Sequence, residues 1–174
     1  MTLTAAQSNP DPEQDGPAGE STEVPAAGSL EAAIALAREA HTGQVDKLGV
    51  DYIEHPLGVM SMVQTVPEKT VAVLHDVVED TPVTLDDLRA QGFAETLVRA
   101  VDALTKRPGE PLAESMARVA ADPLALIVKH ADLAHNANPA RQAALPAEMS
   151  ERLTAKYEES ARLLGTTLAA VLDR

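Results

Sequence analysis

The sequence predicts an all-α protein, a single helical bundle preceded by an acidic tail, and three observations support that prediction. From Ser29 onward apolar residues recur at helical spacing, and no segment alternates apolar and polar residues as a half-buried strand would. Aromatic residues make up only 2% of the chain, so the core must be built from Leu, Val, Ala and Met, which suit packed helices. The 174 residues are enough for one domain and hardly enough for two.

Capping residues and prolines place the expected helices along the chain. Ser29 is a suitable cap for the first helix, and Thr84 followed by Asp87 resembles a capping box. Pro56 and Pro111 are good first residues of helices, because proline has no amide hydrogen to leave unpaired there. The expected helices cover residues 30–41, 56–66, 69–80, 85–91, 94–106, 111–121, 123–137 and 147–172.

The first 28 residues differ in composition from the rest. Residues 1–28 contain four Pro, three Gly and five acidic residues, with no Lys or Arg. Such a segment cannot bury enough apolar surface to offset the entropy lost on ordering. We therefore expect 1–28 to be a disordered acidic tail and 29–174 to be the domain.

Charge and composition exclude several classes of protein. The net charge of −13 argues against nonspecific binding of nucleic acid, which depends on Lys and Arg neutralising phosphates. It also disfavours a polyanionic substrate, unless a bound dication and local basic residues reverse the field inside one pocket. Without cysteine there is no disulfide or Cys-ligated zinc. No uncharged apolar run approaches the roughly 18 residues needed to span a bilayer, and no secretory signal is evident, so we expect a cytoplasmic protein that binds no membrane.

One short segment gathers an imidazole and three carboxylates. In LHDVVED, His75 and Asp76 are adjacent, Glu79 is four residues after His75, and Asp80 is four after Asp76. On a helix these side chains share one edge, where the acids repel each other and a metal ion is the usual compensating charge. A solvated acidic helix end is an equally good explanation of this segment alone.

Two further segments offer metal ligands or substrate contacts. Lys129, Asp132 and Asn136 lie at i, i+3 and i+7, along one helical face, so Asp132 is a possible ligand and Asn136 a possible donor to a phosphate or sugar. Taken alone, a helix end with Asn136 near its cap explains this segment better. His55 precedes Pro56 at a helix start, where an imidazole is held rigidly, although a lone histidine there is more often a cap or a packed residue.

Together these segments carry a resemblance to a known family. AHTGQVDKLGVDYIEHPL, HDVVEDT and VKHADLAHN follow the order and spacing of the HD hydrolase domain of SpoT-like proteins. They are also similar to the free-standing small alarmone hydrolases. The resemblance runs from about residue 30 to about residue 165, and the combination of HDVVEDT with YIEHPL is specific.

The resemblance implies a fold, a metal site and a reaction. It implies an HD-domain helical bundle that removes the 3′-pyrophosphate from guanosine tetra- or pentaphosphate, a small-molecule nucleotide polyphosphate, typically with Mn²⁺. Glu79 and Asp80 would assist the attacking water, and His41 and His135, which also match, are expected to hold the fold through side-chain hydrogen bonds. The implied metal ligands are His55, His75, Asp76 and Asp132.

The match fails at positions that concern the substrate. The family usually has an Arg-Lys pair packing on or near the guanine, whereas this chain has Asp46 and Lys47. Leu133 stands where an Arg is expected, and base stacking falls to Tyr52, Tyr157 or the stem of Lys47. We expect an acid at position 46 to repel phosphate and to weaken discrimination in favour of guanine.

Basic residues near the end of the chain are possible replacements. Arg152 and Lys156, at i and i+4, could contact phosphate, although a solvated face pairing with Glu148 and Glu159 is the commoner arrangement. The expected substrate contacts are Lys47, Asn136, Arg152 and Lys156.

Two other functions remain open. Asp46 favours an HD phosphatase or pyrophosphohydrolase acting on another nucleotide. A metal- or nucleotide-binding sensor with little turnover is the alternative of a different class, and the presence of both Glu79 and Asp80 counts against it, because a pure binder needs no water-activating acids.

Overall fold

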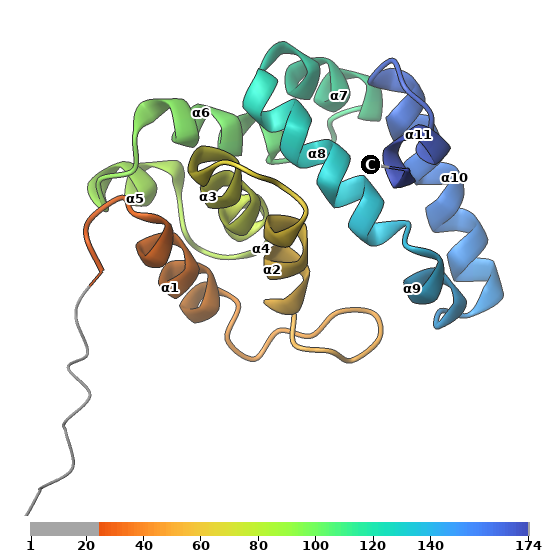
Figure 1. The fold of residues 1–174 in the computed structure, drawn as a ribbon, viewed down its shortest axis with the longest axis horizontal. Helices are drawn as coiled ribbons and strands as arrows, with labels where there is room; N and C mark the ends of the chain where they lie inside the picture. Colours follow the sequence, from red (N-terminus) through yellow and green to blue (C-terminus); the bar gives the residue numbers. More distant parts are fainter. Residues whose placement is uncertain (1–24, 174) are drawn as a thin grey trace, which may run out of the picture.

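The computed structural model describes residues 25–173, and the regular elements in this part of the chain are helices (Figure 1). One isolated antiparallel bridge joins Val45 to Asp51 in the loop between the first two helices. The predicted all-α fold is therefore confirmed. The helices are α1 (Leu30–Ala40), α2 (Glu54–Ser61), α3 (Val66–Leu74), α4 (Val77–Asp80), α5 (Leu85–Ala90), α6 (Glu95–Leu104), α7 (Leu112–Ala121), α8 (Pro123–Asn136), α9 (Pro139–Ala143), α10 (Ala147–Leu163) and α11 (Leu168–Leu172).

Helix α8 is the central element of the bundle. It contacts α2, α3 and α6 on one side and α7, α10 and α11 on the other (Figure 1). Two aliphatic clusters meet along it, because Val128 belongs to the larger cluster and Leu133 to the smaller one. Lys129 and Asp132 lie between these two positions, so both stand on a helix that is packed on two sides.

The predicted caps are present. The hydroxyl oxygen of Ser29 accepts from the amide of the third residue of α1 at 3.1 Å, and Thr84 with Asp87 forms a capping box at the start of α5. A second capping box, Thr65 with Glu68, begins α3 and was not predicted. Each cap pairs amides that a helix start leaves without a partner inside the helix.

The helix predicted over residues 69–80 is broken in the structure. Helix α3 ends at Leu74 and α4 begins at Val77, with His75 and Asp76 at the junction between them. Asp76 has φ −101° and ψ −9°, so the chain changes direction there. The apolar pattern continues through the junction, which is why periodicity alone predicted one helix.

The single helix predicted over residues 147–172 is also wrong. Helix α10 ends at Leu163, and Gly165 has a φ of 75°, which is the left-handed conformation that commonly terminates a helix. Thr167 then caps the separate helix α11. Helix α9, capped by Asn138, was not predicted.

Most of the segment predicted to be a disordered tail, residues 1–28, lies outside the described residues. Residues 25–28 lead into a turn, and a Cβ at Gly28 would lie 2.2 Å from the carbonyl oxygen of Gly92. The boundary predicted between Gly28 and Ser29 therefore falls within a turn that packs on the domain. Within residues 25–173 none of the helices is both long enough and apolar enough to cross a bilayer.

Candidate metal centre and active site

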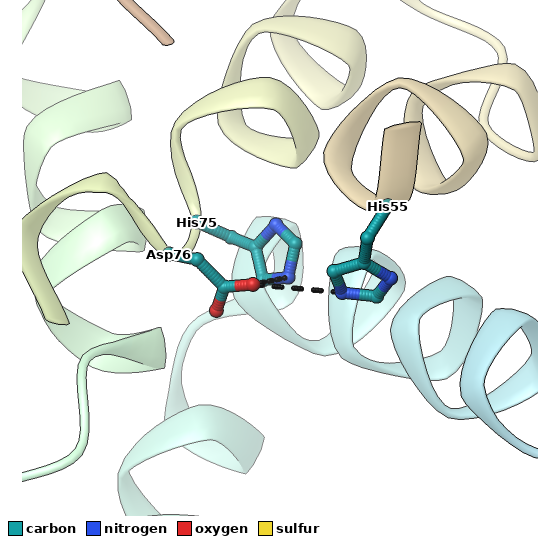
Figure 2. Close-up of side chains that lie close together, drawn as sticks. All are labelled: His55, His75 and Asp76. Carbon is teal, nitrogen blue, oxygen red and sulfur yellow. Dashed lines mark ion pairs between the residues drawn. The ribbon is translucent and has the colours of Figure 1, made fainter. Parts of the chain in front are cut away.

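Three of the four predicted ligands converge from two segments (Figure 2). His55 is in the first turn of α2, and His75 and Asp76 occupy the junction between α3 and α4. One ligand atom from each lies within 4.8 Å of the other two. The carboxylate Oδ2 of Asp76 is 3.1 Å from Nε2 of His75 and 3.5 Å from Nε2 of His55.

The fourth predicted ligand, Asp132, reaches the same point from α8. Its Oδ1 is 3.2 Å from Nε2 of His55 and 3.8 Å from Nε2 of His75. His55, His75 and Asp132 are all buried. The structure thus brings together all four residues that the resemblance implied as ligands.

The hydrogen bond made by Nδ1 of His75 determines whether the other ring nitrogen, Nε2, carries a proton or a lone pair. Nδ1 of His75 is 2.7 Å from the carbonyl oxygen of Ala72, which can only accept, so Nδ1 carries the proton. In the neutral ring Nε2 then has a lone pair, and this buried atom has no hydrogen-bond partner of good geometry. It faces the carboxylates of Asp76 and Asp132, an arrangement that needs a cation or a proton between the groups.

The pKa directions agree with such an arrangement. Burial raises the pKa of Asp76, but the neighbouring His75 and His55 lower it to about 2. Burial is likewise overcome at Asp132, whose pKa lies well below its usual value because of Lys129 and the two histidines. Although burial lowers the pKa of His75, the two carboxylates raise it well above its usual value. The residues present therefore fit a divalent cation, since two ionised carboxylates and two imidazole nitrogens converge on one point.

Asp132 is held by its neighbours on α8. Nζ of Lys129 donates to Oδ2 at 2.7 Å, and Nδ2 of Asn136 donates to Oδ1 at 2.6 Å. The predicted common face of Lys129, Asp132 and Asn136 is confirmed by these contacts. Two donors fix the orientation of the carboxylate, as outer contacts of metal ligands generally do.

Both histidines that were expected to serve the fold make side-chain hydrogen bonds. Nδ1 of His41 lies 2.8 Å from Oε1 of Gln44, and Nδ1 of His135 lies 2.9 Å from Nδ1 of His55. The expectation for His41 and His135 is confirmed in this respect. The His135 contact also bears directly on a candidate ligand.

The two candidate catalytic acids stand beside the cluster. Oε2 of Glu79 accepts from the backbone amide of Lys106 at 2.8 Å. Partial burial raises the pKa of Glu79, the Lys106 amide opposes that shift, and the charges of Asp76 and Asp80 add to it. A carboxylate with a raised pKa is a better proton acceptor than an ordinary surface acid.

Tyr52 links the second acid to the cluster. Its hydroxyl lies 2.8 Å from Oδ2 of Asp76 and 3.0 Å from Oδ2 of Asp80, and its single proton can serve only one of them at a time. Burial and the two carboxylates raise the pKa of Tyr52, so it remains protonated. Gln44 donates to the backbone carbonyl of Asp80 at 3.0 Å and holds the same turn.

A cavity of about 380 Å³ opens over the cluster. Glu79 and Asp80 line it, as do the expected substrate contacts Lys47, Asn136 and Lys156. The lining of the cavity thus contains both acidic and basic groups. The four candidate ligands that line it are His55, His75, Asp76 and Asp132.

Comparison with known proteins identifies the family. A family model described as the HD domain matches residues 33–156. The chain belongs to the HD-domain family. Relatives include a GTP pyrophosphokinase of Streptomyces coelicolor, 35% identical over 120 residues, which are 62% of this chain and 14% of that protein. The bifunctional (p)ppGpp synthase/hydrolase SpoT of Escherichia coli is 30% identical over 122 residues, 62% of this chain and 17% of that protein.

Two further comparisons are a shorter alignment and a solved structure. A guanosine-3′,5′-bis(diphosphate) 3′-pyrophosphohydrolase of Haemophilus influenzae is 37% identical over 75 residues, 41% of this chain and 11% of that protein. The chain therefore spans less than a fifth of the length of these curated relatives. A solved structure described as a metazoan ortholog of SpoT that hydrolyzes ppGpp superposes with a TM-score of 0.70 at 20% identity, covering 87% of this chain and 95% of that chain. That likeness shows the fold.

The HD domain has a group of lysines beside the acids. Burial lowers the pKa of Lys156, and the charges of Lys129, Lys106 and Lys47 lower it further, so these three ammonium groups lie within electrostatic reach of Lys156. All four line the cavity, as does Arg141. In a chain with a net charge of −13, these basic groups offset the carboxylates that line the same cavity, so the cavity wall is less negative than the chain as a whole.

Arg152, the remaining expected substrate contact, is not among the residues that line the cavity. Helix α10 turns Leu153, Lys156, Tyr157 and Ser160 toward the cavity, while Arg152 is exposed. One residue before Leu153 on a helix is rotated by about 100°, which carries Arg152 further from that face than Lys156.

Sequence reasoning gave no role to Lys106 and Arg141. Lys106 follows α6 and comes near the cluster only because the bundle folds α6 against α3 and α8. Arg141 lies in α9, a short helix that was not predicted. The Thr105-Lys106 dipeptide, which also matches the family pattern, is a signal that could have indicated Lys106.

Proposed function

We propose that this HD domain is a metal-dependent phosphohydrolase that removes the 3′-pyrophosphate from guanosine tetra- or pentaphosphate. The observation that carries the proposal is the meeting, in one cavity, of a His/Asp cluster, two further acids and a group of lysines. The printed names of the Haemophilus and Escherichia relatives support the choice of substrate.

The proposed metal ion is Mn²⁺, held by His55, His75, Asp76 and Asp132. Imidazole nitrogens and carboxylate oxygens suit this ion and other dications of similar hardness. When bound, the dication supplies Lewis acidity that neutralises charge on the phosphoryl oxygens. Ala72, Lys129 and Asn136 orient the ligands through the hydrogen bonds described above.

Glu79 is the proposed proton acceptor for the attacking water. The Lys106 amide fixes one of its oxygens, and the raised pKa favours acceptance of a proton. Asp80 is proposed to assist, and the hydroxyl of Tyr52 links it to Asp76. Removal of a general base of this kind typically lowers the rate by about 10²–10⁴-fold.

The proposed phosphate contacts are Lys47, Lys106 and Lys156, with Asn136 close to the metal ligands. Lysine binds phosphate as a point charge, and several lysines offset the repulsion that the negative chain exerts on a polyphosphate. Arg152 is left out of this group because it does not line the cavity.

Hydrolysis of another nucleotide polyphosphate is the second candidate. The observation that favours it is Asp46, which replaces the arginine expected near the guanine. The lysines contact phosphates and do not distinguish one base from another.

A turnover assay tests the proposal and separates its rivals. Metal-stripped protein is given Mn²⁺ and then, in turn, guanosine 3′,5′-bis(diphosphate), its adenosine counterpart, GTP and ATP, and pyrophosphate and orthophosphate are measured. The expected result is pyrophosphate from the guanosine bis(diphosphate). Faster turnover of another nucleotide supports the second candidate, and tight binding with no turnover of any compound supports a sensor.

A further inference from the structure

An ion pair between residues distant in sequence forms part of the cavity wall. The guanidinium of Arg141, on α9, donates to Oδ2 of Asp46 at 2.9 Å, in the loop between α1 and α2. Figure 1 shows this loop running below α2 toward α9. The side chain of Asp46 is 10% exposed and that of Arg141 is 29% exposed, and both line the cavity.

The carboxylate of Asp46 is fully engaged in local contacts. Its Oδ1 accepts from the backbone amides of Leu48 at 2.8 Å and Val50 at 3.1 Å, while its Oδ2 accepts from Arg141. The two amides and the guanidinium therefore balance the negative charge of this carboxylate. The expectation that Asp46 repels phosphate is therefore not supported, because its charge is paired with Arg141.

The guanidinium of Arg141 has donors beyond the one that Asp46 uses. Arginine carries five N–H groups, and the described hydrogen bonds of Arg141 take one of them. The charge of Arg141 lowers the pKa of Tyr157 and so opposes the rise that burial causes. Tyr157 lines the same cavity from α10. Arg141 is thus a partly exposed, oriented guanidinium at a cavity that already contains lysines.

In the described part of the chain Arg141 makes no ion pair with the four candidate ligands, although its charge reaches His135 beside them. Within residues 25–173, the ion pair recorded for Arg141 is with Asp46, while Asp132 pairs with Lys129 and the two candidate histidines. A phosphate undergoing cleavage must lie at the cluster. A cation that pairs with none of the candidate ligands is suited to a phosphate at the other end of the same molecule.

We infer that Arg141, oriented by Asp46, is a substrate-binding residue for the phosphate group at the uncleaved end of the nucleotide. This inference rests on the proposed function, because it takes the cleaved end to be the one at the His/Asp cluster. It adds to the proposed function a residue that holds the phosphate group that is not cleaved. The competing explanation is that the ion pair only ties the loop to α9.

Equilibrium binding of guanosine 5′-diphosphate tests the inference without turnover, since this ligand carries only the phosphates of the uncleaved end. Calorimetric titration compares the Mn²⁺-loaded wild type with Arg141→Gln, Asp46→Asn and Arg162→Gln. Arg162 is a matched control, an arginine whose ion pair with Glu159 is exposed on α10. We expect Arg141→Gln to weaken binding by about tenfold or more, the size of one charge-assisted hydrogen bond, with a smaller loss in Asp46→Asn and none in Arg162→Gln.

Unphosphorylated guanosine, titrated against the same proteins, distinguishes binding from a structural tie. Its affinity should be the same in the wild type and in Arg141→Gln. Equal losses in Arg141→Gln and Asp46→Asn, loss of guanosine affinity in Arg141→Gln, or no binding of the diphosphate to the wild type would each overturn the inference. A wild type that binds the diphosphate through Arg141 but releases no pyrophosphate from the bis(diphosphate) would instead count against the proposed function.

Discussion

The Nδ1 atoms of His55 and His135 lie 2.9 Å apart, so one of the two imidazoles must donate to the other. Burial, together with the charges of His55 and Arg141, lowers the pKa of His135 to about 4, so this ring is neutral near pH 7 and can accept. If His55 donates from Nδ1, its Nε2 presents a lone pair to Asp76 and Asp132. This is the arrangement that the Ala72 carbonyl imposes on His75, and a divalent cation needs it at both rings.

Replacement of His135 by Ala should therefore weaken metal binding without removing a ligand. Loss of an outer partner of a metal-binding histidine typically costs about 10–100-fold in affinity. Calorimetric titration with Mn²⁺ measures the loss, and ¹⁵N chemical shifts of His55 in the metal-free protein report which nitrogen carries the proton. Unchanged affinity together with unchanged His55 shifts would show that His135 has no positioning role.

Gly58, on α2, leaves space for the imidazole ring of His135, on α8. A Cβ at this position would lie 2.2 Å from Nε2 of His135. Gly58→Ala should favour the helix by about 1 kcal/mol, because alanine has the higher helix propensity. The same change should lower metal affinity, because the added methyl group forces the His135 ring away from His55. Ser61→Ala, on the same helix, is the control that should leave Mn²⁺ binding unchanged. Wild-type affinity in Gly58→Ala would contradict the account of His135.

The metal-free protein should lose stability as the pH rises above neutrality. The folded-state pKa of His75 is raised well above its usual value, so its contribution is complete below the unfolded pKa of about 6.5 and disappears as the pH passes the folded pKa. Above the folded-state pKa, the lone pair on Nε2 of His75 faces the carboxylates of Asp76 and Asp132. Thermal unfolding from pH 6 to pH 9 checks this, and Mn²⁺ should raise the Tm most at the alkaline end, where it competes with no proton. A Tm that is flat in this range, with a metal effect independent of pH, would oppose the proposal.

Glu79→Gln should keep the metal and lose most of the turnover. The substitution preserves size while removing the proton acceptor, which typically costs about 10²–10⁴-fold in rate. Asp80→Asn is the companion variant, and metal content is measured for both. Wild-type rates in both variants would show that neither acid serves the reaction.

The family resemblance carried by the motifs implied the four residues that converge, whereas each motif alone left another explanation open. The spacing of Lys129, Asp132 and Asn136 also predicted a shared face, because i, i+3 and i+7 are fixed by the helix itself. Local pattern could not predict the turn at His75 and Asp76, since apolar residues continue through it.

The sequence also could not predict contacts between residues that are far apart in the chain. Asp46 and Arg141 are 95 residues apart, and their ion pair depends on where α9 docks. Because the sequence does not reveal Arg141 as the partner of Asp46, it predicted that the acid at position 46 repels phosphate. The sequence also could not show that Arg152 lies outside the cavity lining, because i, i+4 spacing says which side chains are neighbours and not which way the helix faces.

Metal-dependent release of pyrophosphate from guanosine 3′,5′-bis(diphosphate) tests the central claim most directly. Mn²⁺ is titrated into metal-stripped wild type and into Asp132→Asn while pyrophosphate is measured. We predict that the wild type is inactive without metal and reaches full activity near one ion per chain, and that Asp132→Asn binds the ion weakly and remains slow. Equal rates with and without metal, or equal rates in the wild type and Asp132→Asn, would contradict a metal-dependent hydrolase built on His55, His75, Asp76 and Asp132.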